Sequence, residues 1–190
     1  MKLYGTTTSP FVRRVAVVAA EVGEPVERFD TASEAGQARL REVTPIRKVP
    51  VAEIDGRMLF DSRVIIDWIV TTRGWGGVVP PRDRWHEANL LNAIDGAVES
   101  IIQLFYLRRD GVAIDGTAYA ERQLARADAI FAWLVPQLRS DVFGLPEISV
   151  VCSLDWLEFR KQYPVERSGL EPLRAAWRER PSLAATRPHV

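Results

Sequence analysis

An Asp-Gly pair at positions 55–56 is the local signal that most constrains the fold. It stands between two strand-like runs, 51–54 and 57–60. Asp-Gly between such runs is typical of a tight β-hairpin, because both turn residues must adopt positive φ angles. An Asp-Ser pair at 61–62 follows directly and opens a helical pattern. The sequence therefore predicts an antiparallel strand pair that leads straight into a helix.

The residues before this hairpin alternate between strand and helix signals. Lys2–Gly5 is strand-like, and a helical pattern with apolar residues three and four apart follows it until Gly23. Val26–Phe29 indicates a second strand, and Gln37–Val43 a short helical or irregular stretch. The order β-α-β-(α)-β-β-α is that of a thioredoxin-like domain, an α/β unit in which helices cover a small mixed sheet.

The second part of the chain has a different pattern. Glycines and prolines in 75–82 indicate a linker, and everything beyond it has helical periodicity. We expect a thioredoxin-like domain at 1–74 and an all-helical bundle at 83–190. The expected helices of this bundle are Trp85–Arg109, Thr117–Leu138, Ile148–Lys161 and Pro172–Arg180.

Composition excludes several classes of function. The 25 basic and 25 acidic residues balance, so no net charge would attract a nucleic acid or an anionic membrane. The single cysteine, Cys152, lies in an apolar helix and fits a buried thiol in a reducing compartment. The two histidines, His86 and His189, have no partner at metal-site or triad spacing. With no signal peptide or membrane-length apolar run recognised, we expect a cytoplasmic protein without a metal.

Four short motifs carry a resemblance to a known family. They are Ser-Pro-Phe-Val at 9–12, Val-Pro at 49–50, Asp-Ser at 61–62, and the helical run 151–160. In this order and spacing they resemble the glutathione transferase superfamily, in particular its bacterial serine-type members, over essentially the whole chain. The resemblance implies an enzyme that activates glutathione, its co-substrate, for conjugation to small electrophiles. It also implies a homodimer.

By this resemblance Ser9 is the catalytic residue. At a helix start it would donate a hydrogen bond to the glutathione sulfur, where free backbone N–H groups and the helix dipole also favour a thiolate. Taken alone, Ser-Pro indicates only an ordinary helix start. Thr8 is the alternative, and Tyr4 lies too early, within the strand. Because serine cannot form a mixed disulfide, thiol-transfer chemistry is disfavoured.

The resemblance also implies a set of glutathione-binding residues. A cis Val49–Pro50 bond would present the Val49 backbone to the cysteinyl segment as a short added strand. Asp61 would bind the γ-glutamyl ammonium, and Ser62 its carboxylate. A trans proline at a strand start and an ordinary helix cap are the alternative interpretations. Phe11 belongs to the same set.

Two further residues of this set are placed by resemblance alone. Lys48 would contact the glycyl carboxylate, and Asp95 would reach the glutamyl ammonium bound to the partner in a dimer. A solvated loop lysine and an exposed helical acid are the alternatives.

The sequence departs from the family pattern at two positions. Arg47 replaces the usual glycine before the lysine position, so a positive φ there would be costly. In the second domain, Gly144 and Glu147 stand where a Ser/Thr-x-x-Asp capping box usually begins the central helix.

A second function remains open from the sequence. The alternative is a non-catalytic binding module, of the type of the stringent-starvation proteins, bacterial relatives that use this fold to bind a protein partner. In that case the motif residues would serve only as helix caps.

Overall fold

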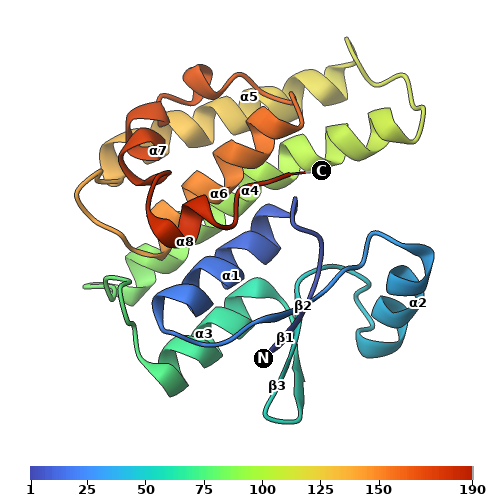
Figure 1. Cartoon of the computed structure of the whole chain (residues 1–190). Coiled ribbons are helices and arrows are strands. Elements are labelled where there is room, and N and C mark those ends of the chain that lie inside the picture. The colour runs from blue at the N-terminus through green and yellow to red at the C-terminus, as the bar shows by residue number, and fades with distance from the viewer. Residues whose placement is uncertain (190) are drawn as a thin grey trace. The chain divides into compact units, whose positions relative to one another are not determined.

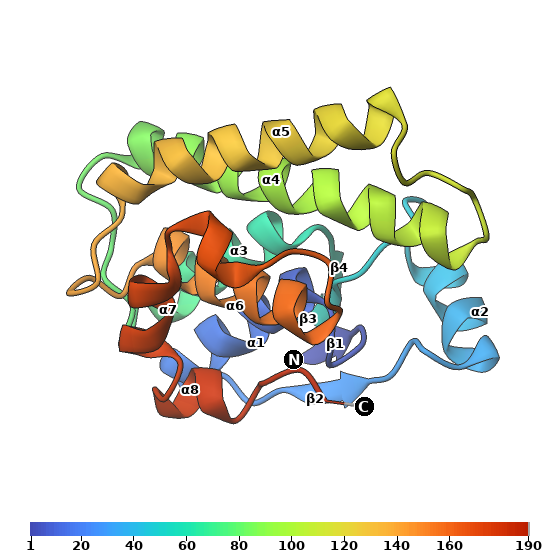
Figure 2. The same ribbon diagram turned by 90° about the horizontal axis from the view of Figure 1, so that it is seen from above.

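The computed structural model describes residues 1–189, which group into two compact units. The first contains residues 1–80 together with the described residues from Arg178 onward. The second contains Pro81–Trp177. This division differs from the expected boundary of 83–190, because the last residues of the chain pack with the first unit. Figures 1 and 2 label the elements of both.

The first unit has a four-stranded mixed sheet in the order β2-β1-β3-β4. β1 and β2 are parallel, and the other two pairs are antiparallel. In Figure 1, α1 and α3 lie side by side on one face of this sheet, and α2 lies on the other side. The thioredoxin-like arrangement expected from the sequence is confirmed. The strands are β1 (Lys2–Tyr4), β2 (Glu27–Phe29), β3 (Val51–Ile54) and β4 (Arg57–Leu59), and the helices are α1 (Pro10–Glu21), α2 (Glu34–Val43) and α3 (Ser62–Arg73).

The predicted hairpin is present between β3 and β4. Asp55 and Gly56 have φ angles of 47° and 74°, the positive values that a tight two-residue turn requires. Successive residues of β3 point to opposite faces, and Val51, Ala52 and Ile54 are all buried because helices lie on both sides of the sheet (Figure 1). Asp61 then caps α3, so the chain leaves the hairpin directly into the helix, as predicted.

The junction between β1 and α1 is tight because of a glycine. A Cβ atom on Gly5 would lie 2.3 Å from Cγ2 of Val12, a distance that no side chain tolerates. The absence of a side chain lets the end of β1 pass directly beneath the first turn of α1. Ser9 caps this helix and Pro10 occupies its first position, both preferred residue types there.

Hydrogen bonds of polar side chains hold the segment around α8 against α1. Arg180 donates two hydrogen bonds to Glu21, at 2.7 and 2.6 Å, and these hold the pKa of Glu21 below its usual value against the effect of burial. Ser182 donates a third to the same carboxylate, at 2.5 Å. Arg13 reaches the Leu183 carbonyl at 2.9 Å. These contacts are the physical reason that α8 (Pro181–Ala184) belongs to the first unit.

The second unit is helical, as predicted. α4 and α5 run alongside each other along most of their length (Figure 2). The apolar stripe of α5 is buried and includes Ala127, Phe131 and Leu134. The helices are α4 (Arg84–Arg109), α5 (Ala118–Leu134), α6 (Leu145–Phe159) and α7 (Glu171–Trp177), with short 3-10 turns at Val135–Gln137 and Val165–Ser168.

One described helix, α4, is long and apolar enough to span a membrane by length and composition. The expectation that no run reaches this length overlooked it. Its buried residues recur three and four apart and include Leu90, Ile94, Ile101 and Leu104. Because α5 and α6 pack against it, its apolar character has a structural cause within the unit.

α6 is the central helix of the second unit, and nearly every residue of its first three turns is buried. Gly144 caps it without a side chain, while Glu147 accepts a hydrogen bond from the Gly144 backbone N–H at 3.1 Å. One of the two hydrogen bonds of a capping box, the one to the Glu147 side chain, is therefore present. Cys152 is completely buried in this helix, which confirms the predicted buried thiol.

A buried arginine joins α6 to α7. Arg174 is only 2% exposed and donates to Asp155, itself 6% exposed, at 2.6 Å. It also pairs with Glu158 and, at 3.2 Å, with Glu171. Burial alone would lower the pKa of Arg174, but these acids raise it above its ordinary value. The guanidinium is therefore charged and paired at neutral pH.

Two acids of the second unit make its stability depend on pH. Burial, and then the negative charge of Glu147, raise the pKa of Glu87 to about 7 from 4.5. Burial also raises the pKa of Glu147. Because the folded state holds the Glu87 proton more tightly than the unfolded state, the free energy of unfolding falls as pH rises from about 4.5 to 7.

Glu87→Gln is expected to remove this loss, because glutamine carries no charge at any pH. At pH 8 the variant should be more stable than the wild type by about 2 kcal/mol, and at pH 5 nearly equal to it. Urea unfolding at both pH values measures this. Glu99→Gln, at an exposed position of the same helix, is the matched control and should show no such difference. Equal stability of wild type and Glu87→Gln at pH 8 would contradict the prediction.

Candidate functional site

The sheet register brings the sequence motifs to one end of the first unit. Tyr4, the last residue of β1, pairs with Val51, the first residue of β3. Leu59, at the end of β4, pairs with Ala52 next to it. The same end of the sheet therefore carries the loop before α1, the Val-Pro pair before β3 and the Asp-Ser pair at the start of α3. The sequence motifs are neighbours in space.

Ser9 lies half-buried at the start of α1, where its backbone leaves the extended strand for the helix. Its Oγ accepts a long hydrogen bond, 3.4 Å, from the Val12 N–H. Ser33 caps α2 in the same way, at 3.1 Å. Because the Ser9 oxygen only accepts in this contact, its hydroxyl proton remains available to donate to a ligand.

Thr8 and Tyr4 are the two alternatives to Ser9 as the residue that contacts the sulfur. Thr8 is half-buried, and its hydroxyl lies 3.3 Å from that of Thr6, so these two side chains interact with each other. Tyr4 is in β1, only 1% exposed, and donates to Glu53 at 3.2 Å. Its position within the strand is as the sequence predicts.

The Val49–Pro50 peptide bond is cis. Pro50 is buried, and Val49 is half-buried against an apolar cluster formed by Tyr4, Leu40 and Val51. The proline therefore stands at the beginning of β3 and beside the end of β1, where the register places the Ser9 loop. A backbone in this position is suited to pair with an extended peptide ligand.

The loop before this proline keeps a left-handed residue despite the loss of glycine. Arg47 has a φ of 52°, which costs a side-chain-bearing residue about 1 kcal/mol or more. Lys48 follows it with an exposed side chain. Its ammonium group is accessible to a ligand from solvent.

Asp61 and Ser62 take different positions at the start of α3. Asp61 is exposed and caps the helix by accepting from the Arg63 N–H at 2.9 Å. The peptide bond before it, Phe60–Asp61, is cis. Ser62 is only 1% exposed, and its Oγ accepts two hydrogen bonds from Arg14. The pair therefore combines a solvent-facing carboxylate with a buried hydroxyl.

Sequence reasoning missed Arg14. It lies in α1, is 3% exposed, and stacks over Phe11 at 5.0 Å from the ring centre. Phe11 itself is half-buried one turn earlier. The only sequence signal was the Arg13-Arg14 pair within an otherwise apolar helix, where a charged side chain needs a polar partner.

Asp95 belongs to the other compact unit. It lies near the middle of α4 with a half-buried side chain. Its predicted ligand role depends on a second protomer, so it stays a prediction.

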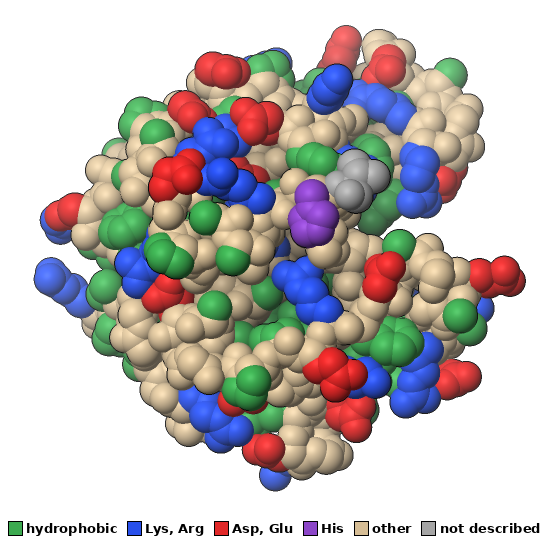
Figure 3. Space-filling view, in the orientation of Figure 1, with side chains coloured by type: hydrophobic (Ala, Val, Ile, Leu, Met, Phe, Trp, Pro, Cys, Tyr) green, Lys and Arg blue, Asp and Glu red, His purple; other side chains and the backbone are tan. Residues whose placement is uncertain are grey.

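Within residues 1–189, no three histidine, cysteine or acidic side chains come together in a way that could hold a metal ion. On the face shown in Figure 3, basic and acidic side chains are interspersed and do not gather by sign. The surface in this view offers no broad patch for a polyanion.

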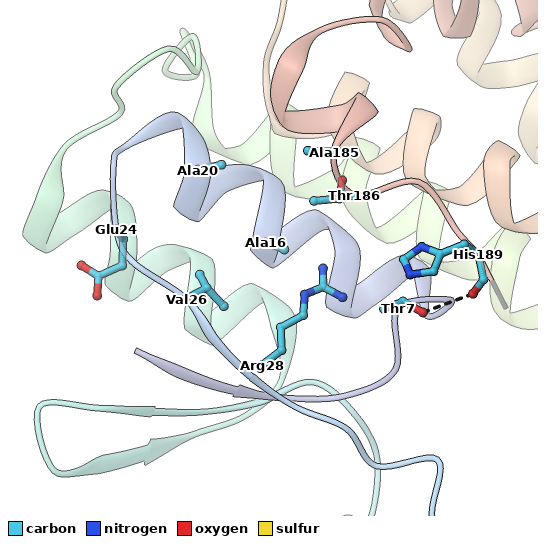
Figure 4. A pocket seen from close by; sticks show the side chains of 9 residues that line it. All are labelled: Thr7, Ala16, Ala20, Glu24, Val26, Arg28, Ala185, Thr186 and His189. Atoms are coloured by element: carbon cyan, nitrogen blue, oxygen red, sulfur yellow. Dashed lines mark hydrogen bonds between the residues drawn. The ribbon is translucent and has the colours of Figure 1, made fainter.

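A hollow of the first unit is lined by residues other than the predicted site residues. It has a volume of about 420 Å³ and runs between α1, β2 and the last described residues (Figure 4). Its polar groups are largely engaged within the protein. Thr7 donates to the His189 carbonyl, and Glu24 pairs with the N-terminus and Arg73. Arg28 lines the hollow from β2 and extends toward α1 (Figure 4), and desolvation lowers the pKa of its guanidinium below the usual value.

Comparison with known proteins shows which family the first unit is similar to. Residues 3–75 match the family described as "Glutathione S-transferase, N-terminal domain". They belong to it. This match spans the sheet, the three helices and every motif residue of the first unit, and it confirms the resemblance found in the sequence.

Full-length relatives extend the likeness to the second unit. A glutathione transferase family member from Pseudomonas fluorescens Pf-5, solved with bound glutathione, is 29% identical, with a TM-score of 0.82 over 100% of this chain and 99% of that one. A glutathione S-transferase from Methylobacillus flagellatus KT, also with bound glutathione, is 27% identical, with a TM-score of 0.83 over 99% of each. The whole chain therefore has the glutathione transferase fold.

One curated relative matches over nearly its full length. The uncharacterized GST-like protein YibF of Escherichia coli K12 is 27% identical over 99% of this chain and 98% of its own. Its description states a likeness to glutathione transferases and no activity.

Proposed function

We propose that this protein is a glutathione transferase that binds glutathione at the motif-bearing end of the first unit and conjugates it to small electrophiles. The observation that carries the proposal is the convergence of the Ser9 loop, the cis Val49–Pro50 bond and the start of α3 at one sheet edge. Two solved structures with the same fold hold glutathione.

Ser9 would act on the sulfur. Its hydroxyl donates to the glutathione thiolate, while its oxygen keeps the Val12 N–H bond. This hydrogen bond and the start of α1 stabilise the anionic sulfur, so more of the ligand is ionised at neutral pH. The thiolate then attacks the electrophilic carbon. A C–S bond forms, and the leaving group departs with the electron pair of the bond that breaks.

The remaining residues would hold the tripeptide. The Val49 backbone pairs with the cysteinyl segment, and the exposed Lys48 meets the glycyl carboxylate. Asp61 faces solvent with its carboxylate and suits the glutamyl ammonium. Ser62 donates its hydroxyl proton to the glutamyl carboxylate, because its oxygen already accepts from Arg14.

A cytoplasmic homodimer completes the proposal. In it, Asp95 of one protomer would contact the glutamyl ammonium of the ligand bound to its partner. Light scattering should give twice the chain mass of 21.4 kDa. A monomer would remove this role from Asp95.

Conjugation of glutathione to a generic aryl halide tests the activity. The wild type should release halide only when glutathione is present, with a rate that saturates in glutathione. An Asp61→Asn variant should raise KM for glutathione, because it removes the charge that faces the ammonium. A rate equal to the uncatalysed reaction would contradict the proposed activity.

A non-catalytic binding module is the second candidate. The observation that favours it is that Ser9 and Asp61 both act as helix caps in the structure. Stoichiometric recovery of one protein partner, together with no glutathione binding, would support this alternative and overturn the enzyme.

A further inference from the structure

The hollow between α1, β2 and the last described residues lies wholly within the first unit. Its volume of about 420 Å³ is within the range of small-molecule sites. It shares no residue with the proposed glutathione site. Its apolar walls are formed by small side chains, namely Ala16 and Ala20 of α1, Val26 before β2, and Ala185 after α8.

Arg28 gives this hollow a positive charge that the protein leaves unpaired. The side chain extends from β2 toward α1 (Figure 4) and is still open to solvent, so a ligand can reach it. Its guanidinium makes no hydrogen bond or ion pair with any of residues 1–189. Desolvation lowers the pKa of this guanidinium, and no carboxylate offsets the effect. Arg73 and Arg180 are the opposite case, because the acids that they pair with raise their pKa.

The acidic side chain that lines the hollow does not neutralise Arg28. Glu24 accepts hydrogen bonds from the N-terminal ammonium at 3.1 Å and from Arg73 at 2.8 Å. In Figure 4 its carboxylate points away from Arg28. The charge of Glu24 is therefore already compensated, whereas a partly desolvated guanidinium without a partner is a costly arrangement. An anion from solvent would supply the missing partner.

His189 adds a second polar group to the same end of the hollow. Its ring and the Arg28 guanidinium lie near each other in Figure 4. Nδ1 lies 3.0 Å from the Arg187 carbonyl oxygen, which can only accept, so this contact places a proton on Nδ1. Nε2 is then left for a contact with a ligand. The Thr7 hydroxyl donates to the His189 carbonyl at 3.3 Å and holds this segment to the loop before α1.

We propose that the hollow binds a small aliphatic carboxylate, with the carboxylate on Arg28 and the alkyl chain against the apolar walls. The planar guanidinium donates two parallel N–H bonds to the two oxygens, and His189 Nε2 approaches the same group. The chain lies against the alanines of α1 and the C-terminal segment. A compact anion would leave these walls in water, and a neutral chain would leave the guanidinium unpaired.

Titration of the isotope-labelled intact protein with hexanoate, followed by NMR, tests this proposal. Binding should saturate at one hexanoate per chain with a dissociation constant on the order of 1 mM, as expected for so small a ligand. The largest amide shifts should fall on Ala16, Ala20 and Ala185. Acetate, which lacks the chain, and 1-hexanol, which lacks the charge, should each bind about 10-fold more weakly or less.

Three variants separate the charge from the shape of the hollow. Arg28→Met keeps an apolar stem but no charge, so it should weaken hexanoate binding about 10-fold or more and leave 1-hexanol unchanged. Arg57→Met, at an exposed position of the opposite edge strand, is the matched control and should bind both as the wild type does. Ala20→Leu, at an exposed position of α1, should weaken both ligands because leucine fills the space of the chain.

The outcomes that contradict the proposal are specific. The absence of saturable hexanoate binding would overturn the site, and equal binding by Arg28→Met would overturn the role of the guanidinium. Displacement of hexanoate by glutathione would place the carboxylate in the glutathione site and overturn the hollow as its location. Because the two sites share no residue, Arg28→Met should bind glutathione as the wild type does, so either proposal can fail without the other.

Discussion

Ser9→Ala is expected to lower kcat/KM for aryl halide conjugation by about 100- to 1000-fold, the usual effect of removing a hydrogen bond to a developing or reacting anion. The hydroxyl lies at the start of α1 with its proton available, and alanine supplies no donor in its place. The thiol of bound glutathione should therefore ionise at higher pH. A pH profile of kcat/KM should move to the alkaline side in the variant.

Ser33→Ala is the matched control for this prediction. Ser33 caps α2 through the same kind of hydrogen bond, so both variants should lose about 1 kcal/mol of stability. Only Ser9→Ala should lose activity. Thr8→Ala tests the alternative sulfur contact and should keep most of the rate. If Ser9→Ala retains full activity while Thr8→Ala is inactive, the sulfur contact belongs to Thr8.

Arg174→Met is expected to lower the free energy of unfolding by about 3–5 kcal/mol, the range for breaking a buried ion pair on one side. Methionine removes the buried cation that faces Asp155, and the ion pairs of Arg174 with Glu158 of α6 and Glu171 of α7 are also lost. Urea or thermal unfolding measures the change.

A double variant tests whether the buried charge of Asp155 causes this destabilisation. Arg174→Met with Asp155→Leu removes both charges, so it should recover a large part of the loss. Arg122→Met, at an exposed site on α5, should change stability by no more than about 0.5 kcal/mol. A loss below about 1 kcal/mol for Arg174→Met would show that the buried network contributes little.

Much of the fold follows from local signals in the sequence. The Asp-Gly turn, the Ser9 and Asp61 caps, and the apolar spacing of α1 and α5 each act within a few residues, and the structure has them all. The end of the chain could not be predicted in this way. Arg180 meets Glu21 across 159 positions, and no local pattern marks that pairing.

The sequence predicted where the candidate site lies, but it did not predict all of the residues that form it. Because β3 runs antiparallel to both β1 and β4, the three motifs meet at the same end of the sheet. The Arg14–Ser62 contact depends on how α1 and α3 pack, which side-chain spacing does not specify. Arg47 shows the opposite case, because it has a φ of 52° although its residue type disfavours that value.

Titration of the intact protein with glutathione tests the central claim most directly, since it needs no electrophile. The account predicts saturable binding of one glutathione per chain, with a dissociation constant within the range of about 1 μM to 1 mM usual for enzyme substrates. Asp61→Asn should weaken this binding, and Glu99→Gln should leave it unchanged. The absence of binding at millimolar glutathione would contradict the account.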